Sequence, residues 1–246
     1  MALPMNSMPT FTLTIPSTNQ KVRYRPFLVK DEKALMIAQQ SEDLIVMADT
    51  LKNVIASCVI DKVDVESLAT FDIEYIFTQI RAKSVGETIE LIMSCDDDHG
   101  EELNKKASQK ITVDLINDIE IKRNPDHNKK IELFGDVGVV MRYPTFVQTK
   151  EIFGSETNDG DIKIDKVFDV IAECIDFIYQ GDDIYYAKEQ KKEELITFLE
   201  NLTTEQFLKV QKFFDTMPRI STTIRHTCPV CNKQYERVLE GLNGFF

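Results

Sequence analysis

Two hydrophobic periods divide the first 86 residues of the chain. Apolar side chains occupy every second position in residues 11–15 and 22–25, with a polar, turn-forming tetrapeptide between the two runs, so a β-hairpin is expected. Apolar residues then recur three and four positions apart over residues 42–60 and 73–80, as in amphipathic helices. The pattern therefore predicts a hairpin followed by helices, ending at Gly86.

Between residues 87 and 143 the hydrophobic period changes to two. Several short runs alternate apolar and polar side chains, and the segments between them are rich in Asp, Asn, Gly and Lys. This block is expected to be a central antiparallel β unit. The runs are residues 88–93, 111–115, 119–121, 131–133 and 137–143.

Helical spacing returns in residues 144–219, after Pro144. One helix is predicted to run past Ile175 and Ile178 and to end at Gly181. Two more are predicted over residues 193–202 and 204–217, the second preceded by a capping box, in which a Thr and a Gln three residues later satisfy free backbone N–H groups.

Residues 220–246 return to alternation around a Cys-x-x-Cys turn and end in apolar side chains. The fold class is therefore α+β, in four parts. They are an N-terminal hairpin with helices (1–86), a central β unit (87–143), a helical block (144–219) and a zinc-ribbon-like hairpin (220–246), which we expect to pack back on the central unit.

Composition narrows the functions that the chain can have. Of 246 residues, 43% are hydrophobic and 28% charged, which is ordinary for a soluble globular protein. The 29 Lys and Arg against 41 Asp and Glu give a net charge of −12, which disfavours nucleic acid and anionic membranes as partners. Neither a bilayer-spanning apolar stretch nor a signal peptide is recognisable, so a cytoplasm-like compartment is expected.

The clearest chemical motif is the pair Cys228 and Cys231. A Cys-x-x-Cys turn between strands forms half of a zinc-ribbon site, and the other half is expected from Cys95 and His99, which follow the 88–93 run. Four such ligands would make a closed, structural zinc site. A metal-free turn and a redox pair remain alternatives, although redox pairs usually stand at a helix N-terminus and strands flank this one.

The fourth ligand has alternatives, because Asp97 or Asp98 can replace the imidazole of His99. The two other cysteines, Cys58 and Cys174, lie within apolar helical patterns and are expected to be buried core residues.

Other features favour binding over catalysis. The sequence has three histidines and neither a Gly-rich phosphate loop nor a Gly-x-Ser-x-Gly elbow, so no familiar hydrolase or nucleotide site is indicated. Arg23 and Arg25 alternate on one strand face and either meet an acidic partner or are simply solvated. Leu242, Phe245 and Phe246 form an apolar end that must pack internally or insert into a neighbouring protein.

Several segments together resemble the baseplate hub subunit and hub-assembly proteins of T4-like bacteriophages. The resemblance extends over essentially the whole chain, and the combination of segments is more specific than any one of them. The segments are residues 13–18, 22–30, 71–77, 80–87, 228–233 and 238–246. Such proteins carry a second Cys-x-x-Cys-like pair that faces the terminal one, whereas this chain has Cys95 and then His99 after three aspartates.

This resemblance implies a non-enzymatic protein that helps to form the central hub of a contractile tail. Its partners would be the hub and tape-measure proteins of the same phage. It would act in the host cytoplasm during assembly and then reside in the virion tail baseplate. The alternatives are a chaperone of the tape-measure or hub protein that is absent from the mature virion, a zinc-ribbon module that binds nucleic acid, and a thiol oxidoreductase.

Overall fold

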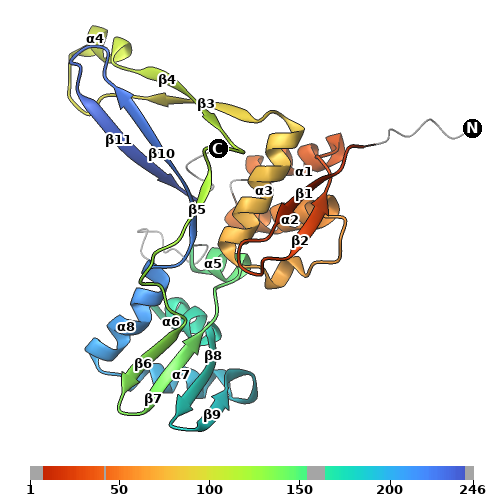
Figure 1. Ribbon diagram of the computed structural model, residues 1–246, viewed down its shortest axis with the longest axis vertical. Helices are drawn as coiled ribbons and strands as arrows, with labels where there is room; N and C mark the ends of the chain where they lie inside the picture. Colours follow the sequence, from red (N-terminus) through yellow and green to blue (C-terminus); the bar gives the residue numbers. More distant parts are fainter. Residues whose placement is uncertain (1–7, 42, 154–163, 242–246) are drawn as a thin grey trace, which may run out of the picture.

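The elements of the protein gather in three parts, shown in Figure 1. The structure, a computed structural model, describes residues 8–41, 43–153 and 164–241. An N-terminal lobe is followed by an arm of two β-hairpins and by a second lobe, the sheet lobe, in which helices pack on a four-stranded sheet. The α+β class expected from the sequence is confirmed.

The N-terminal lobe contains the predicted hairpin and helices. Its strands pair in antiparallel fashion, and its helices bury Ile55, Ile73 and Ile76 against Ile15 and Tyr24 of the hairpin. The elements are β1 (Phe11–Thr14), β2 (Lys21–Tyr24), α1 (Val29–Gln40), α2 (Leu44–Cys58), the 3-10 turn η1 (Val65–Ser67) and α3 (Thr70–Ser84).

The arm joins two segments that are more than a hundred residues apart in the sequence. β3 (Thr88–Met93) pairs with β4 (Gln109–Asp114), and the short helix α4 (Glu101–Lys106) lies in the loop between them. β10 (Arg219–Thr227) pairs with β11 (Gln234–Glu240) along one edge. The other edge of β10 takes β5 (Glu120–Lys122).

A shared core joins the two hairpins of the arm. Ile89 and Val113 of the first hairpin are buried together with Ile220 and Ile224 of the second. Buried and exposed positions alternate along most of β10, so Ile220 and Ile224 lie on the same face of the strand and meet the other hairpin.

The sheet lobe is a four-stranded antiparallel sheet in the order β6-β7-β8-β9. Its inner face, which includes Ile131 and Val139, packs against Val170, Leu199 and Phe213 of the helices. α5 (Phe146–Phe153) lies between the lobes, in contact with α2 and α6. The remaining elements are β6 (Lys130–Phe134), β7 (Val137–Met141), α6 (Ile164–Glu173), β8 (Ile175–Gln180), β9 (Asp183–Tyr186), η2 (Ala187–Glu189), α7 (Lys192–Glu200) and α8 (Thr204–Asp215).

The prediction of one continuous helix through Ile178 is wrong. α6 ends at Glu173, and Ile175 and Ile178 belong to β8. Ile178 lies opposite Val139 of β7 and contacts the same core, so its three-residue spacing from Ile175 is accidental. A short apolar run rich in branched and aromatic residues cannot be assigned by spacing alone.

Strands form in the predicted central β unit, but they divide among three sheets. β3 and β4 pair with each other, β5 pairs with β10, and β6 and β7 pair with β8 and β9. Pairing between distant strands depends on which apolar faces meet in space, and the local alternation of residues does not encode it. Within the described residues, no helix is long and apolar enough to cross a lipid bilayer.

Candidate metal centre

Two loops meet at the outer tip of the arm and carry all four predicted ligands. Cys228 and Cys231 lie in the turn between β10 and β11, and Cys95 and His99 lie in the loop after β3. Their ligand atoms all lie within 4.8 Å of one another. The sequence-based set is thus brought together in space, and these side chains could hold a metal ion.

The Cys-x-x-Cys turn is shaped by its own backbone. The Cys228 N–H donates to the carbonyl of Lys233, and the Asn232 N–H donates to the carbonyl of Cys228. Asn232 has φ +59°, a left-handed conformation that Asn adopts more readily than most residues. The Val230 N–H donates a hydrogen bond to the Cys228 sulfur at 3.4 Å, so the turn places a backbone donor beside this candidate metal ligand.

The opposite loop is fixed by side-chain hydrogen bonds. Asp98 Oδ1 accepts hydrogen bonds from the Gly100 N–H (2.9 Å) and from the side-chain amide of Asn104 (2.8 Å). Asn104 in turn accepts from the His99 N–H, at 2.9 Å. The Asp98 carboxylate, one of the alternatives to His99 as a ligand, therefore serves to hold the loop in place.

Two of the distances between the ligand atoms agree with tetrahedral coordination. The Sγ atoms of Cys95 and Cys231 are 3.8 Å apart, and Cys228 Sγ is 3.6 Å from Nε2 of His99. Zn–S bonds of about 2.3 Å and Zn–N bonds of about 2.0 Å at tetrahedral angles require separations of about 3.8 Å and about 3.5 Å. The His99–Cys95 separation, 3.1 Å, is the shorter exception.

The thiolate is the form of cysteine that binds metals, and the pKa shifts differ among the three cysteines of the cluster. The backbone N–H of Lys233 lowers the pKa of Cys231, but burial and the neighbouring sulfurs of Cys228 and Cys95 outweigh it and raise this pKa. Burial raises the pKa of Cys228, but the backbone N–H groups of Cys231 and Val230 outweigh it and lower this pKa to about 6. The pKa of Cys95 is also lowered, because the hydrogen bond from Tyr235 and its other polar contacts outweigh burial. The neighbouring sulfurs of Cys95 and Cys228 raise the pKa of His99.

Contacts around the ligands fasten the two hairpins together at the tip. The hydroxyl of Tyr235 is 3.0 Å from Cys95 Sγ, and Lys233 Nζ is 2.9 Å from Asp97. Arg237 bonds both the carboxylate of Asp96 and, at 2.8 Å, the carbonyl of Ser94. Asp97, the other alternative ligand, is therefore paired with Lys233. Sequence reasoning missed these contacts, and its one available signal was the excess of cations on 233–237 opposite three aspartates.

The remaining two cysteines behave as core residues, as predicted. Cys58 and Cys174 are fully buried, and burial raises the pKa of both thiols, that of Cys174 to about 12. Both thiols are therefore protonated and unreactive at neutral pH.

The arginines predicted to bind a partner both have partners within the chain. Arg23 forms an ion pair with Asp61 at 2.7 Å, yet 61% of its side chain is exposed. Arg25 is 12% exposed and pairs with Asp31 at 2.9 Å. The apolar residues Leu242, Phe245 and Phe246 lie outside the described residues. Partner binding by these five residues stays a prediction.

Comparison with known proteins identifies the family. The model of the T4 bacteriophage base plate protein family matches residues 8–246, nearly the whole chain. The chain therefore belongs to this family. No curated protein and no solved structure matches it. Membership makes the protein a structural component of the phage baseplate, located in the virion tail among other baseplate proteins.

Proposed function

We propose that this protein is a non-enzymatic component of the central hub of the baseplate and acts through contacts with hub and tape-measure proteins. The family match over residues 8–246 carries the proposal. The shape of the molecule supports it, because two lobes and a projecting arm offer separate surfaces to several neighbours (Figure 1).

The cluster at the arm tip supports a structural role for a bound metal. Three thiolates and one imidazole supply four protein ligands, which fill a tetrahedral zinc site and leave no open position for a substrate. In this proposal zinc joins the loop of Cys95 and His99 to the turn of Cys228 and Cys231, and so holds the two hairpins of the arm as one unit.

Partner contacts in this proposal use the surfaces predicted from the sequence. Arg23 keeps most of its side chain exposed beside Asp61 and is available to an acidic partner, whereas Arg25 is enclosed and orients the strand. The net charge of −12 argues against the zinc-ribbon module that binds nucleic acid.

A stop codon in the gene of this protein tests the proposal. Phage carrying it would be grown on suppressing and non-suppressing hosts, and the tail structures in each lysate counted by electron microscopy. If the protein is a hub component, complete baseplates should be absent from the lysate of the non-suppressing host and present in the lysate of the suppressing host. Normal tails in the non-suppressing host would contradict the proposal. Mass spectrometry of virions from the suppressing host then separates a resident hub subunit, which is present, from an assembly chaperone, which is absent.

A further inference from the structure

One edge of strand β10 is largely without a partner strand. β10 has nine residues, and its first edge pairs with β11 from Ser221 to Thr227. Its second edge pairs with β5 only from Arg219 to Ser221. Beyond Ser221 the second edge continues for six residues, and no strand of the described chain lies on it.

Hydrogen bonds at the two ends of the hairpin show which main-chain groups face this second edge. The Cys228 N–H donates to Lys233, and the Gly241 N–H donates to Ile220. Hydrogen-bonded positions alternate in an antiparallel pair, so the even-numbered residues of β10 bond to β11. The N–H and C=O groups of the odd-numbered residues therefore point to the second edge.

Three odd-numbered residues lie past the end of β5, namely Thr223, Arg225 and Thr227. Within the described residues, their outward main-chain groups have no hydrogen-bond partner. The side chain of Arg225 does not shield the edge, because its Nε donates a hydrogen bond to the carboxylate of Glu236 on β11 at 2.8 Å. Lysine and proline, which commonly protect exposed edges, are both missing from β10.

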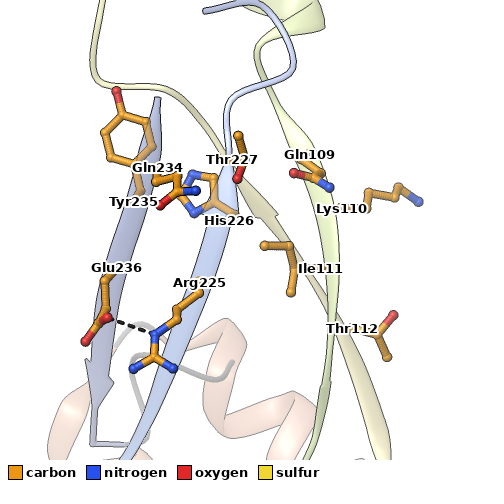
Figure 2. Close-up of a pocket in the computed structure, with 10 residues that line it drawn as sticks. All are labelled: Gln109, Lys110, Ile111, Thr112, Arg225, His226, Thr227, Gln234, Tyr235 and Glu236. Atoms are coloured by element: carbon orange, nitrogen blue, oxygen red, sulfur yellow. Dashed lines mark hydrogen bonds and ion pairs between the residues drawn. The ribbon is translucent and has the colours of Figure 1, made fainter. Parts of the chain in front are cut away.

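A groove of about 810 Å³ lies between the hairpins and is lined by residues of β4, β10 and β11. Figure 2 shows Gln109 and Ile111 pointing from β4 toward β10, so their side chains form a wall opposite the strand. His226 also lines the groove, is 6% exposed and stacks on Tyr235 with ring centroids 5.1 Å apart. Within the described part of the chain, neither of its ring nitrogens has a hydrogen-bond partner.

We propose that this groove binds an extended segment of another baseplate protein as an added β-strand on the second edge of β10. The inference rests on the proposed function, in which the protein acts through contacts with its neighbours in the baseplate. An extended backbone presents donors and acceptors at every second residue, which matches Thr223, Arg225 and Thr227. The added strand continues the line of β5.

The lining of the groove specifies the segment further. A docked helix would leave the main-chain groups of β10 unpaired and would need an apolar groove, whereas this one is largely polar. A segment of about six residues covers the free edge. One of its side chains packs on Ile111, and a hydrogen-bonding side chain such as Asn or Ser supplies the buried imidazole of His226 with the partner that it lacks.

Amide hydrogen exchange tests the inference on the full-length protein, free and in a complex. The complex is purified after co-expression with the hub and tape-measure proteins of the same phage. We expect the amides of Thr223, Arg225 and Thr227 to exchange at least tenfold more slowly in the complex. The even-numbered amides, already bonded to β11, change little. A stable complex in which the three amides exchange at the free rate overturns the inference and leaves the proposed function standing.

A backbone variant with a matched control completes the test. Thr223→Pro removes an outward N–H without breaking the pairing with β11, and Thr223→Ala shortens the same side chain but keeps the N–H. The Pro variant is expected to lose at least tenfold in affinity for the complex and the Ala variant less than twofold, with equal metal content in both. Equal binding by the two variants contradicts the added strand.

Two further outcomes would contradict the assignment of an added strand from another baseplate protein. If the free protein forms dimers in which the three amides are protected, the occupant is a second copy of this chain, and the assignment to another baseplate protein is wrong. If the chain joins no complex with any of these proteins, both the proposed function and the added strand fail.

Discussion

The sulfur atoms of Cys95 and Cys231 lie 3.8 Å apart, although the two cysteines are 136 positions apart in the sequence. Bringing the ends of so long a segment together costs conformational entropy. A metal ion bound by both cysteines offsets part of that cost, since metal binding to residues that meet only in the folded state adds to folding stability. A metal ion at the arm tip is therefore expected to stabilise the two paired hairpins.

Replacing one ligand should empty the metal centre. Purified wild-type protein is expected to contain about one equivalent of zinc by elemental analysis, and Cys228→Ser should abolish it and lower the melting temperature. The matched control is Cys58→Ser, a buried cysteine far from the cluster, which should keep its zinc even if it is less stable. If the wild-type protein contains no zinc as purified and melts at the same temperature as Cys228→Ser, the ligands are vestigial.

Tyr235 should strengthen metal binding through the sulfur of Cys95, which it contacts at 3.0 Å. Groups that hydrogen-bond to metal ligands typically change metal affinity by about 10- to 100-fold. Tyr235→Phe is therefore expected to weaken zinc binding by about tenfold, measured by competition with a chromogenic chelator. Tyr185→Phe, on exposed strand β9, serves as the control and should bind zinc like the wild type. Equal affinities for all three proteins would exclude this role.

The enclosed ion pair of Arg25 and Asp31 should make stability depend on pH. Burial raises the pKa of Asp31, but hydrogen bonds from the Leu28 N–H and from Arg25 outweigh it, and the net shift is downward. The carboxylate therefore stabilises the fold above the unfolded pKa of about 3.9, and the contribution is lost as the pH falls through the lower, folded value.

Asp31→Asn is expected to reduce the free energy of unfolding by about 3 kcal/mol at pH 7, because it leaves the guanidinium of Arg25 without its charge partner. Urea unfolding at pH 7 and at pH 3 measures the difference, which should shrink at the lower pH. Asp61→Asn removes the partner of the exposed Arg23 and should change the free energy of unfolding far less than Asp31→Asn does. A pH-independent deficit in Asp31→Asn would contradict the linkage.

Gly138 should not tolerate a side chain. It faces Tyr179 across the sheet, and a Cβ at this position would overlap the Tyr179 hydroxyl and the backbone carbonyl of Ile131. Gly138→Ala is expected to lower the free energy of unfolding by about 2 kcal/mol. Adding Tyr179→Ala should rescue little, because the clash with the carbonyl of Ile131 remains. If Tyr179→Ala restored the full free energy of unfolding, the clash would involve the Tyr179 side chain alone.

Features encoded by neighbouring residues could be predicted from the sequence. The hairpin of β1 and β2 and the capping box at α8 are confirmed, with Gln206 N–H 3.3 Å from the Thr203 hydroxyl and the Gln206 side chain accepting from the Thr203 N–H. The proximity of Cys95, His99, Cys228 and Cys231 was predictable too, because Cys and His at short spacings at the ends of strands are typical of metal sites, and metal binding by them stays a prediction.

Features that depend on distant contacts could not be predicted. The end of α6 was misplaced because Ile175 and Ile178 fit a helix and a buried strand equally well. The pairing of β5 with β10 and the contact of Tyr235 with Cys95 join residues that are about a hundred or more positions apart. No local pattern specifies them, because they arise only once the apolar faces of the two hairpins meet.

Measuring the mass of the assembled hub shows whether this protein is built into it by contacts with other baseplate proteins. The full-length protein would be co-expressed with the hub and tape-measure proteins of its phage, and the purified complex measured by native mass spectrometry. We expect one complex that contains this chain in a fixed stoichiometry. If the hub assembles without this chain while the folded chain remains free in the same sample, the protein is not a hub component.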